Sequence, residues 1–201
     1  MTERVVLATA NPDKAREIEA ALADQGFDLI PRPVDLPDVD ETGDTLLANA
    51  RLKALALGAA TGLAALADDT GLEVDALGGA PGVFSARYAG PDATYAANVA
   101  HLLGAMESAR RNARTARFRT VVVLVRPDGS EVVADGVVEG VIADSPRGSG
   151  GFGYDPVFVP AGSGGRTFAE MSMTEKQQIS HRGRALRALS RQLREAVPPE
   201  S

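Results

Sequence analysis

Lysine is scarce in this chain, because 18 of the 21 basic residues are arginines and only Lys14, Lys53 and Lys176 are lysines. A lysine ammonium is a compact, flexible point charge that suits phosphate contacts, whereas arginine presents a rigid planar fork. Two interpretations are open from composition alone. Either the three lysines serve an anionic ligand, or they are chance survivors of a codon bias, and the residues around each lysine must decide.

A turn near the N-terminus connects a strand-like apolar run to a predicted helix. Its residues are Thr9, Ala10, Asn11, Pro12, Asp13 and Lys14. Free backbone N–H groups and the positive end of a helix dipole meet at such a turn, which favours a bound anion. The glycines and the Gly-Lys-Ser/Thr ending of a Walker A loop are absent. A plain turn with a good N-cap would look similar, so this motif alone is weak.

Two adjacent carboxylates, Asp68 and Asp69, follow the predicted buried strand 63–67. They repel one another unless a cation or a raised pKa relieves them. Together with Glu41 they would form an all-oxygen site suited to Mg²⁺. Adjacent strand residues point to opposite sides, so we expect at most one aspartate to reach a metal directly unless the backbone turns. The alternative is that they cap a turn.

Three further groups of polar or aromatic residues are candidates. Asn49 and Lys53 are four apart and share a helix face, although a solvated stripe would look the same. In the glycine-rich loop 148–156, Phe152 could stack on a flat base or plug the loop. The last group lies within about two helical turns and comprises Lys176, Ser180, His181 and Arg182. A single histidine such as His181 more often bonds a carbonyl.

Length and composition exclude several classes of protein. A chain of 201 residues with 44% hydrophobic and 24% charged residues predicts one compact domain, 1–201, which could be bilobal. The net charge of −6 disfavours nucleic-acid partners. No apolar run reaches the ~18 residues of a membrane span, which predicts no membrane partner and a cytoplasmic location. The absence of cysteine and the presence of only two histidines leave oxygen ligands for any metal.

The apolar pattern predicts elements that alternate between strand and helix. The predicted strands are 4–9, 27–30, 63–67, 118–125 and 131–141, and the predicted helices are 12–25, 45–61, 94–106 and 174–196. Helices and strands that alternate early, followed by a hairpin around Pro127-Asp128-Gly129, indicate a mixed α/β sheet flanked by helices.

Taken together, these segments resemble the inosine triphosphate pyrophosphatase family, also called the Ham1 family. The resemblance covers nearly the whole chain in six ordered blocks. The blocks are Thr9 to Lys14; Glu41-Thr42-Gly43 with Asn49 and Lys53; Asp68 to Leu72; Pro81-Gly82 with Ser85 to Tyr88; Phe152 to Pro156; and Glu170 with Lys176 and Ser180-His181-Arg182. All three lysines fall inside these blocks, which favours a role in ligand binding over codon bias.

The resemblance implies Mg²⁺-dependent hydrolysis of inosine, deoxyinosine and xanthosine triphosphates to monophosphate and pyrophosphate. It also implies a homodimer and an elongated mixed sheet with two lobes around a central active-site cleft. It assigns Glu41 and Asp69 to the metal, with Asp68 as a further candidate, and Asp69, Lys14 and Lys53 to catalysis. It assigns substrate binding to Thr9, Ala10, Asn11, Pro12, Asp13, Lys14, Asn49, Thr70, Phe152, Gly153, Tyr154, Asp155, Lys176, Ser180, His181 and Arg182.

Two other functions stay open at this point. One is a related nucleotide pyrophosphatase that acts on modified pyrimidine nucleotides. The other is a nucleotide-binding module without turnover, against which Lys14, Glu41, Asp69 and Lys176 argue. A nucleic-acid-binding protein is a distant third, because the net charge is −6.

Overall fold

The computed structural model describes residues 2–23, 25–107 and 113–195. Its helices are α1 (Pro12–Leu22), α2 (Leu46–Thr61), α3 (Tyr95–Ala105), α4 (Met173–Ile179) and α5 (His181–Glu195), with short 3-10 helices η1 (Asp75–Leu77), η2 (Ser85–Arg87) and η4 (Phe168–Glu170). Its strands are β1 (Glu3–Leu7), β2 (Phe27–Ile30), β3 (Ala64–Val74), β4 (Pro81–Gly82), β5 (Thr115–Val125), β6 (Glu131–Ile142) and β7 (Phe158–Pro160).

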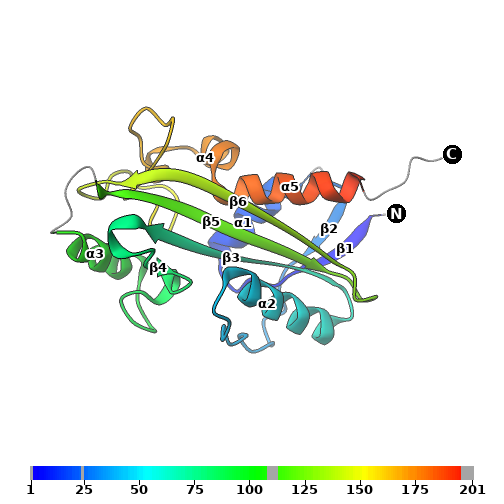
Figure 1. Ribbon diagram of the computed structural model, residues 1–201. Helices are drawn as coiled ribbons and strands as arrows, with labels where there is room; N and C mark the ends of the chain where they lie inside the picture. The colour runs from blue at the N-terminus through cyan, green and yellow to red at the C-terminus, as the bar shows by residue number, and fades with distance from the viewer. Residues whose placement is uncertain (1, 24, 108–112, 196–201) are drawn as a thin grey trace. The chain divides into compact units, whose positions relative to one another are not determined.

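The strands form one seven-stranded sheet in the order β2-β1-β3-β5-β6-β7, with β4 paired to β3 off this path. The first three strands along this order are parallel, as βαβ connections require. The pairs β3–β4 and β6–β7 are antiparallel. The sheet is therefore mixed, and the predicted mixed α/β fold is confirmed (Figure 1).

The chain divides into two compact units. The first contains Met1–Asp69, Thr120–Gly136 and Arg182–Ser201, and the second contains Thr70–Arg119 and Val137–His181. Three strands and one helix contribute residues to both units. A single bilobal domain around a central cleft stays a prediction.

In the first unit, helices cover both faces of the sheet (Figure 1). Ile18 of α1 and Leu186 of α5 share a buried cluster with Leu66 of β3. On the opposite face of β3, Ala65 lies 3.7 Å from the position that a Cβ would take at Gly58 of α2. Since successive strand residues point to opposite faces, α2 packs on the face away from α1 and α5.

The second unit has its own aromatic core. The rings of Phe118 and Phe158 meet edge to face with their centroids 4.7 Å apart, and Phe158 stacks on Phe168 at 5.3 Å. Val99 and Leu102 of α3 belong to the same buried cluster. Burial of this aromatic and aliphatic surface away from water stabilises the unit.

Several predicted elements have different boundaries in the structure. The strand predicted over 63–67 continues to Val74, so Asp68 and Asp69 lie inside β3 and not after its end. The helix predicted over 174–196 is two helices, because Ser180 has extended backbone angles of φ −68° and ψ 158° between α4 and α5. The first helix ends at Leu22, earlier than predicted.

Helix α4 begins with a capping box that makes a pH-dependent prediction. The backbone N–H of Ser172 donates to Glu175, and together with Arg166 this holds the pKa of that carboxyl at about 2, below its usual 4.5. Because the folded pKa is lowered, this stabilisation is present above the unfolded pKa and is lost as pH falls toward 2. We expect Glu175→Gln to lower the melting temperature at pH 7, and the difference from wild type to vanish near pH 2. Because glutamine can also complete a capping box, a difference that is constant with pH would contradict the contribution of the Glu175 charge.

Candidate active site

The turn between β1 and α1 is an ordered N-cap. The Asn11 side chain accepts hydrogen bonds from the backbone N–H groups of Asp13 and Lys14 at 2.9 and 3.3 Å. Thr9 accepts from the Asn11 N–H at 3.1 Å. The sequence predicted free N–H groups here, but Asn11 already occupies two of them. The turn therefore contributes mainly by fixing where α1 begins and where Lys14 points.

Lys14 belongs to a buried ion-pair cluster in the first unit, formed by Lys14, Glu17, Asp68 and Arg182. Asp68 Oδ2 lies 3.4 Å from the Lys14 ammonium and 3.0 Å from the Arg182 guanidinium, which also pairs with Glu17. Burial opposes ionisation of Asp68, but the nearby cations outweigh it and hold its pKa well below the usual range. Burial lowers the pKa of Lys14, although Asp68 works against this shift.

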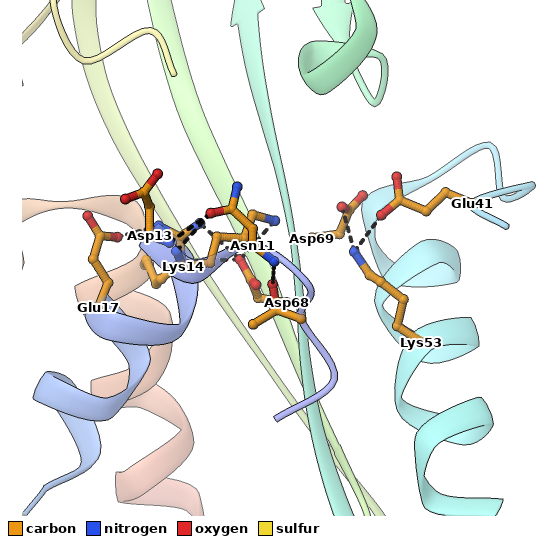
Figure 2. Close-up of polar contacts among 10 residues, drawn as sticks. Asn11, Asp13, Lys14, Glu17, Glu41, Lys53, Asp68 and Asp69 are labelled. Carbon is orange, nitrogen blue, oxygen red and sulfur yellow. Dashed lines mark hydrogen bonds and ion pairs between the residues drawn. The ribbon is translucent and has the colours of Figure 1, made fainter. Parts of the chain in front are cut away.

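A second cluster of the first unit joins Glu41, Lys53 and Asp69. The Lys53 ammonium donates to Glu41 Oε1 at 2.7 Å and to Asp69 Oδ1 at 3.0 Å, and Figure 2 shows both carboxylates pointing at it. Burial disfavours charged Lys53, but Asp69 and other carboxylates outweigh this and raise its pKa. For Asp69, burial raises the pKa, and Lys53 only partly offsets the effect. This carboxylate therefore has less positive charge around it than Asp68 has.

The two clusters lie at the end of β1. The last register pair between β1 and β3 is Leu7 with Leu66, while β3 continues to Val74. Asp68 and Asp69 thus lie beyond the paired part of β1 on the same strand, turned to opposite sides as the sequence predicted. Lys14 is electrostatically coupled to Asp69 as well as to Asp68. Ligands of parallel α/β sheets bind at such carboxyl ends of strands.

A pocket of about 320 Å³ adjoins the β1–α1 turn in the first unit. Its lining includes Thr9, Ala10, Asn11 and Pro12 on one side and residues of the loop 31–38 on the other. The turn that the sequence singled out is thus accessible from a concave surface.

The residues expected to hold a divalent cation fit that role in part. Asp69 Oδ2 is buried and makes no hydrogen bond in the part of the chain that the structure describes. Glu41 is a second carboxylate nearby, because the Lys53 ammonium donates to both Glu41 and Asp69. A buried carboxylate oxygen without a donor is costly, so a ligand at this position would be stabilising. Within residues 2–23, 25–107 and 113–195, no group of three acidic or histidine side chains forms a complete metal site. Mg²⁺ commonly takes few protein ligands and keeps several waters.

The second unit holds the predicted nucleoside-binding residues of the glycine-rich loop. The Lys176 ammonium lies 4.7 Å from the centre of the Phe152 ring and pairs with Asp155. Asp155 also accepts from the Phe152 N–H at 2.8 Å, so it shapes the loop. A pocket of about 450 Å³ is lined by this loop, including Phe152 and Gly153, and by Tyr95 of α3. Phe152 is half-buried, and the centroid of its ring lies 5.9 Å from that of the Tyr95 ring.

Several predicted substrate-binding residues are buried. Tyr154 donates to the Ser85 carbonyl at 2.9 Å, and burial raises the pKa of its hydroxyl. Ser180 ends α4, and the His181 ring is 3% exposed and stacks on Phe118 at 4.5 Å. Thr70 is half-buried within β3. These positions favour supporting roles over open contact surfaces.

Asn49 and Arg182 were also expected to contact substrate, but both are almost completely buried. Arg182 is held by Asp68 and Glu17, and Asn49 accepts a hydrogen bond from the Gly43 N–H at 2.8 Å. Glu17 was missed by sequence reasoning. Its position three residues after Lys14 on one helix face was the available signal.

No helix among the described residues is both long and apolar enough to cross a membrane.

Comparisons with known proteins agree on one family. A model described as the Ham1 family matches residues 5–192. A dITP/XTP pyrophosphatase of Thermus thermophilus is 52% identical over 98% of this chain and 94% of its own length. A dITP/XTP pyrophosphatase of Streptomyces avermitilis is 48% identical over 96% of this chain and 98% of its own. The solved HAM1 protein from Coxiella burnetii has a TM-score of 0.87 and 45% identity, covering 96% of this chain and all of its own.

Proposed function

This chain belongs to the Ham1 family, and we propose that it hydrolyses non-canonical purine nucleoside triphosphates, such as dITP, ITP and XTP, to the monophosphate and pyrophosphate. The likeness to curated dITP/XTP pyrophosphatases over nearly the full length of both chains supports this reaction. The activity would remove deaminated purine nucleotides before polymerases incorporate them.

The observation that carries the proposal is the Lys53 bridge. One ammonium holds Glu41 and Asp69 together at 2.7 and 3.0 Å, and Asp69 keeps a buried oxygen that makes no hydrogen bond within the described residues. Lys14 of α1 interacts electrostatically with both Asp68 and Asp69 of β3. Phosphoryl transfer needs positioning and charge neutralisation more than covalent chemistry, and this set of groups offers both.

Two lysines and two aspartates of the first unit have roles in this reaction. Lys14 and Lys53 bind the triphosphate and neutralise charge that develops on its oxygens. Asp69 orients the attacking water and accepts its proton, with Lys53 fixing the carboxylate through Oδ1. Asp68 turns away to Lys14 and Arg182, so it positions the phosphate-binding lysine.

Mg²⁺ is the cofactor that this donor set would take, held by Glu41 and Asp69. When bound, the ion supplies Lewis-acid neutralisation of the phosphate oxygens. Asp68 already pairs with Lys14 and Arg182, which disfavours it as a third ligand of the metal.

Base selection is assigned to the second unit. We propose that Phe152 stacks on the base and that Lys176, oriented by Asp155, donates toward a 6-keto oxygen. Adenine presents an amino group at that position, which leaves a donor facing a donor, and such mismatches can lower reactivity by ~10⁴-fold. His181 supports this region by stacking on Phe118.

The test is a set of kcat/KM values for ITP, XTP, GTP, ATP and a methylated pyrimidine triphosphate, with products identified. We expect the highest kcat/KM values for inosine and xanthosine triphosphates. A preference for the pyrimidine would favour the related pyrophosphatase activity, and tight binding without product would favour a non-catalytic module. We further propose a homodimer, which sedimentation of the purified chain would test, and a cytoplasmic location, which fractionation of the cells that express it would test.

Replacing Lys14 should weaken triphosphate binding. A hydrogen bond to a charged group contributes about 1.5–3 kcal/mol, so Lys14→Ala should raise the KM for ITP by roughly 10- to 100-fold. Arg16→Ala is the matched control, because Arg16 lies on the same helix and pairs with Asp13 at the surface. Steady-state kinetics of both variants would check this, and an unchanged KM in Lys14→Ala would contradict the phosphate-binding role.

A further inference from the structure

Asn49 is a polar residue that the proposed reaction leaves without a role. It is 0% exposed on α2, a helix whose other buried residues are alanine and leucine. Its Oδ1 accepts a hydrogen bond from the Gly43 N–H at 2.8 Å, whereas its buried Nδ2 makes no hydrogen bond to any described residue. Burying an amide is costly unless it makes hydrogen bonds. The bond to Gly43 is thus the interaction that accounts for a polar side chain here.

The loop that carries Glu41 lies directly against α2 at Gly43. A Cβ at Gly43 would come within 2.7 Å of both the Ala48 side chain and Asn49 Oδ1. Only a glycine therefore lets the backbone approach the helix so closely. The hydrogen bond and the close approach fix the loop at a point two residues after Glu41.

The same helix also receives the Glu41 carboxylate. Asn49 and Lys53 are four apart, and Lys53 donates to Glu41 at 2.7 Å (Figure 2). Side chains four apart share one face of a helix. Helix α2 thus holds this loop twice, at the Gly43 backbone through Asn49 and at the Glu41 carboxylate through Lys53.

We propose that Asn49 is a positioning residue that sets the affinity of the Glu41–Asp69 site for a divalent cation by holding the Gly43 backbone. The inference deepens the proposed function and rests on it, because it takes Glu41 as a metal ligand. Partners that orient metal ligands change metal affinity by 10- to 100-fold when they are lost.

Three variants separate positioning from stability. Asn49→Leu keeps a side chain of similar volume but removes the oxygen that accepts the Gly43 hydrogen bond. Gly43→Ala disturbs the same hydrogen bond from the loop, because the added Cβ would collide with Asn49. Asn49→Asp keeps an oxygen toward Gly43 and replaces the Nδ2 amino group with a second carboxylate oxygen. Thr61→Val is the matched control, because Thr61 accepts a backbone N–H bond from Leu63 at the far end of α2.

The readouts are hydrogen exchange of the Gly43 amide, Mn²⁺ binding to the nucleotide-free chain, and the Mg²⁺ concentration for half-maximal turnover. In Asn49→Leu and Gly43→Ala we expect faster Gly43 exchange and metal affinity at least ~10-fold weaker, while turnover at saturating Mg²⁺ changes little. The double variant should bind the metal no more weakly than the weaker-binding of the two single variants, since both substitutions remove the same contact.

The conservative variant and the control complete the test. Asn49→Asp should unfold at lower temperature, because it buries a charge, yet retain slow Gly43 exchange and wild-type metal affinity. Thr61→Val should leave metal affinity unchanged. Wild-type Gly43 exchange in Asn49→Leu, or faster exchange with wild-type Mn²⁺ affinity, would overturn the inference. Absence of Mg²⁺-dependent turnover in the wild type would instead overturn the proposed function, and Mn²⁺ affinity would still decide the role of Asn49.

Discussion

Asp69→Asn should lower kcat for ITP hydrolysis by about 10³-fold or more, a loss within the range for removal of a general base. Asparagine keeps the size of the side chain and an oxygen for Lys53, but it cannot accept a proton from water. It also removes a negative charge from the proposed cation site. Stopped assays with radiolabelled ITP would measure the residual rate, and calorimetry with ITP would show whether nucleotide binding is retained.

A carboxylate elsewhere on the same strand provides the control. Glu73 lies on β3 and pairs with Arg117 and Arg119 at 3.5 Å with partial exposure. Surface ion pairs contribute about 0–1 kcal/mol, so Glu73→Gln should leave kcat unchanged and alter stability little. An Asp69→Asn enzyme with wild-type kcat would remove the water-activation role.

Arg182→Leu should lower the free energy of unfolding by about 3–5 kcal/mol, because it leaves a buried carboxylate without its main partner. The Arg182 guanidinium is 1% exposed and makes two hydrogen bonds to Asp68, at 3.0 and 3.1 Å, in addition to its pair with Glu17. The substitution would remove two charge-assisted hydrogen bonds from Asp68 and leave its ion pair with Lys14. Urea denaturation at pH 7, followed by circular dichroism, would measure the change.

A partly exposed arginine of the first unit provides the comparison. Arg126 bonds Glu3 at 2.6 and 3.1 Å, but its side chain is 28% exposed. Solvent screens such a pair, so Arg126→Leu should lower the free energy of unfolding by only about 0–1 kcal/mol. Equal losses in the two variants would contradict the assignment of Arg182 to a buried network that supports Lys14.

The local features of the sequence predicted most of the fold. Asn11 and Pro12 are residue types typical of a helix start and stand where α1 begins, and Gly62, with φ +67°, stands directly after the end of α2. The alternation of strand side chains predicted that Asp68 and Asp69 would diverge, which the structure confirms.

Tertiary contacts decided what local signals could not. Strand propensity predicted that the third strand would end before Asp68, but β3 continues to Val74. It can do so because lysines of other elements neutralise the charges of Asp68 and Asp69. The pairing of Asp68 with Arg182 spans 114 residues, so no local pattern could predict it. Burial of Asn49 was equally hidden, because a buried amide and a solvated one have the same sequence signature.

The most direct test of the central claim is phosphorus NMR of the products formed from ITP by the wild-type chain with Mg²⁺ and with a chelator. The account predicts inosine monophosphate and pyrophosphate in equal amounts, formed only with the metal. Release of inosine diphosphate and orthophosphate, or equal product formation in the chelator, would contradict it.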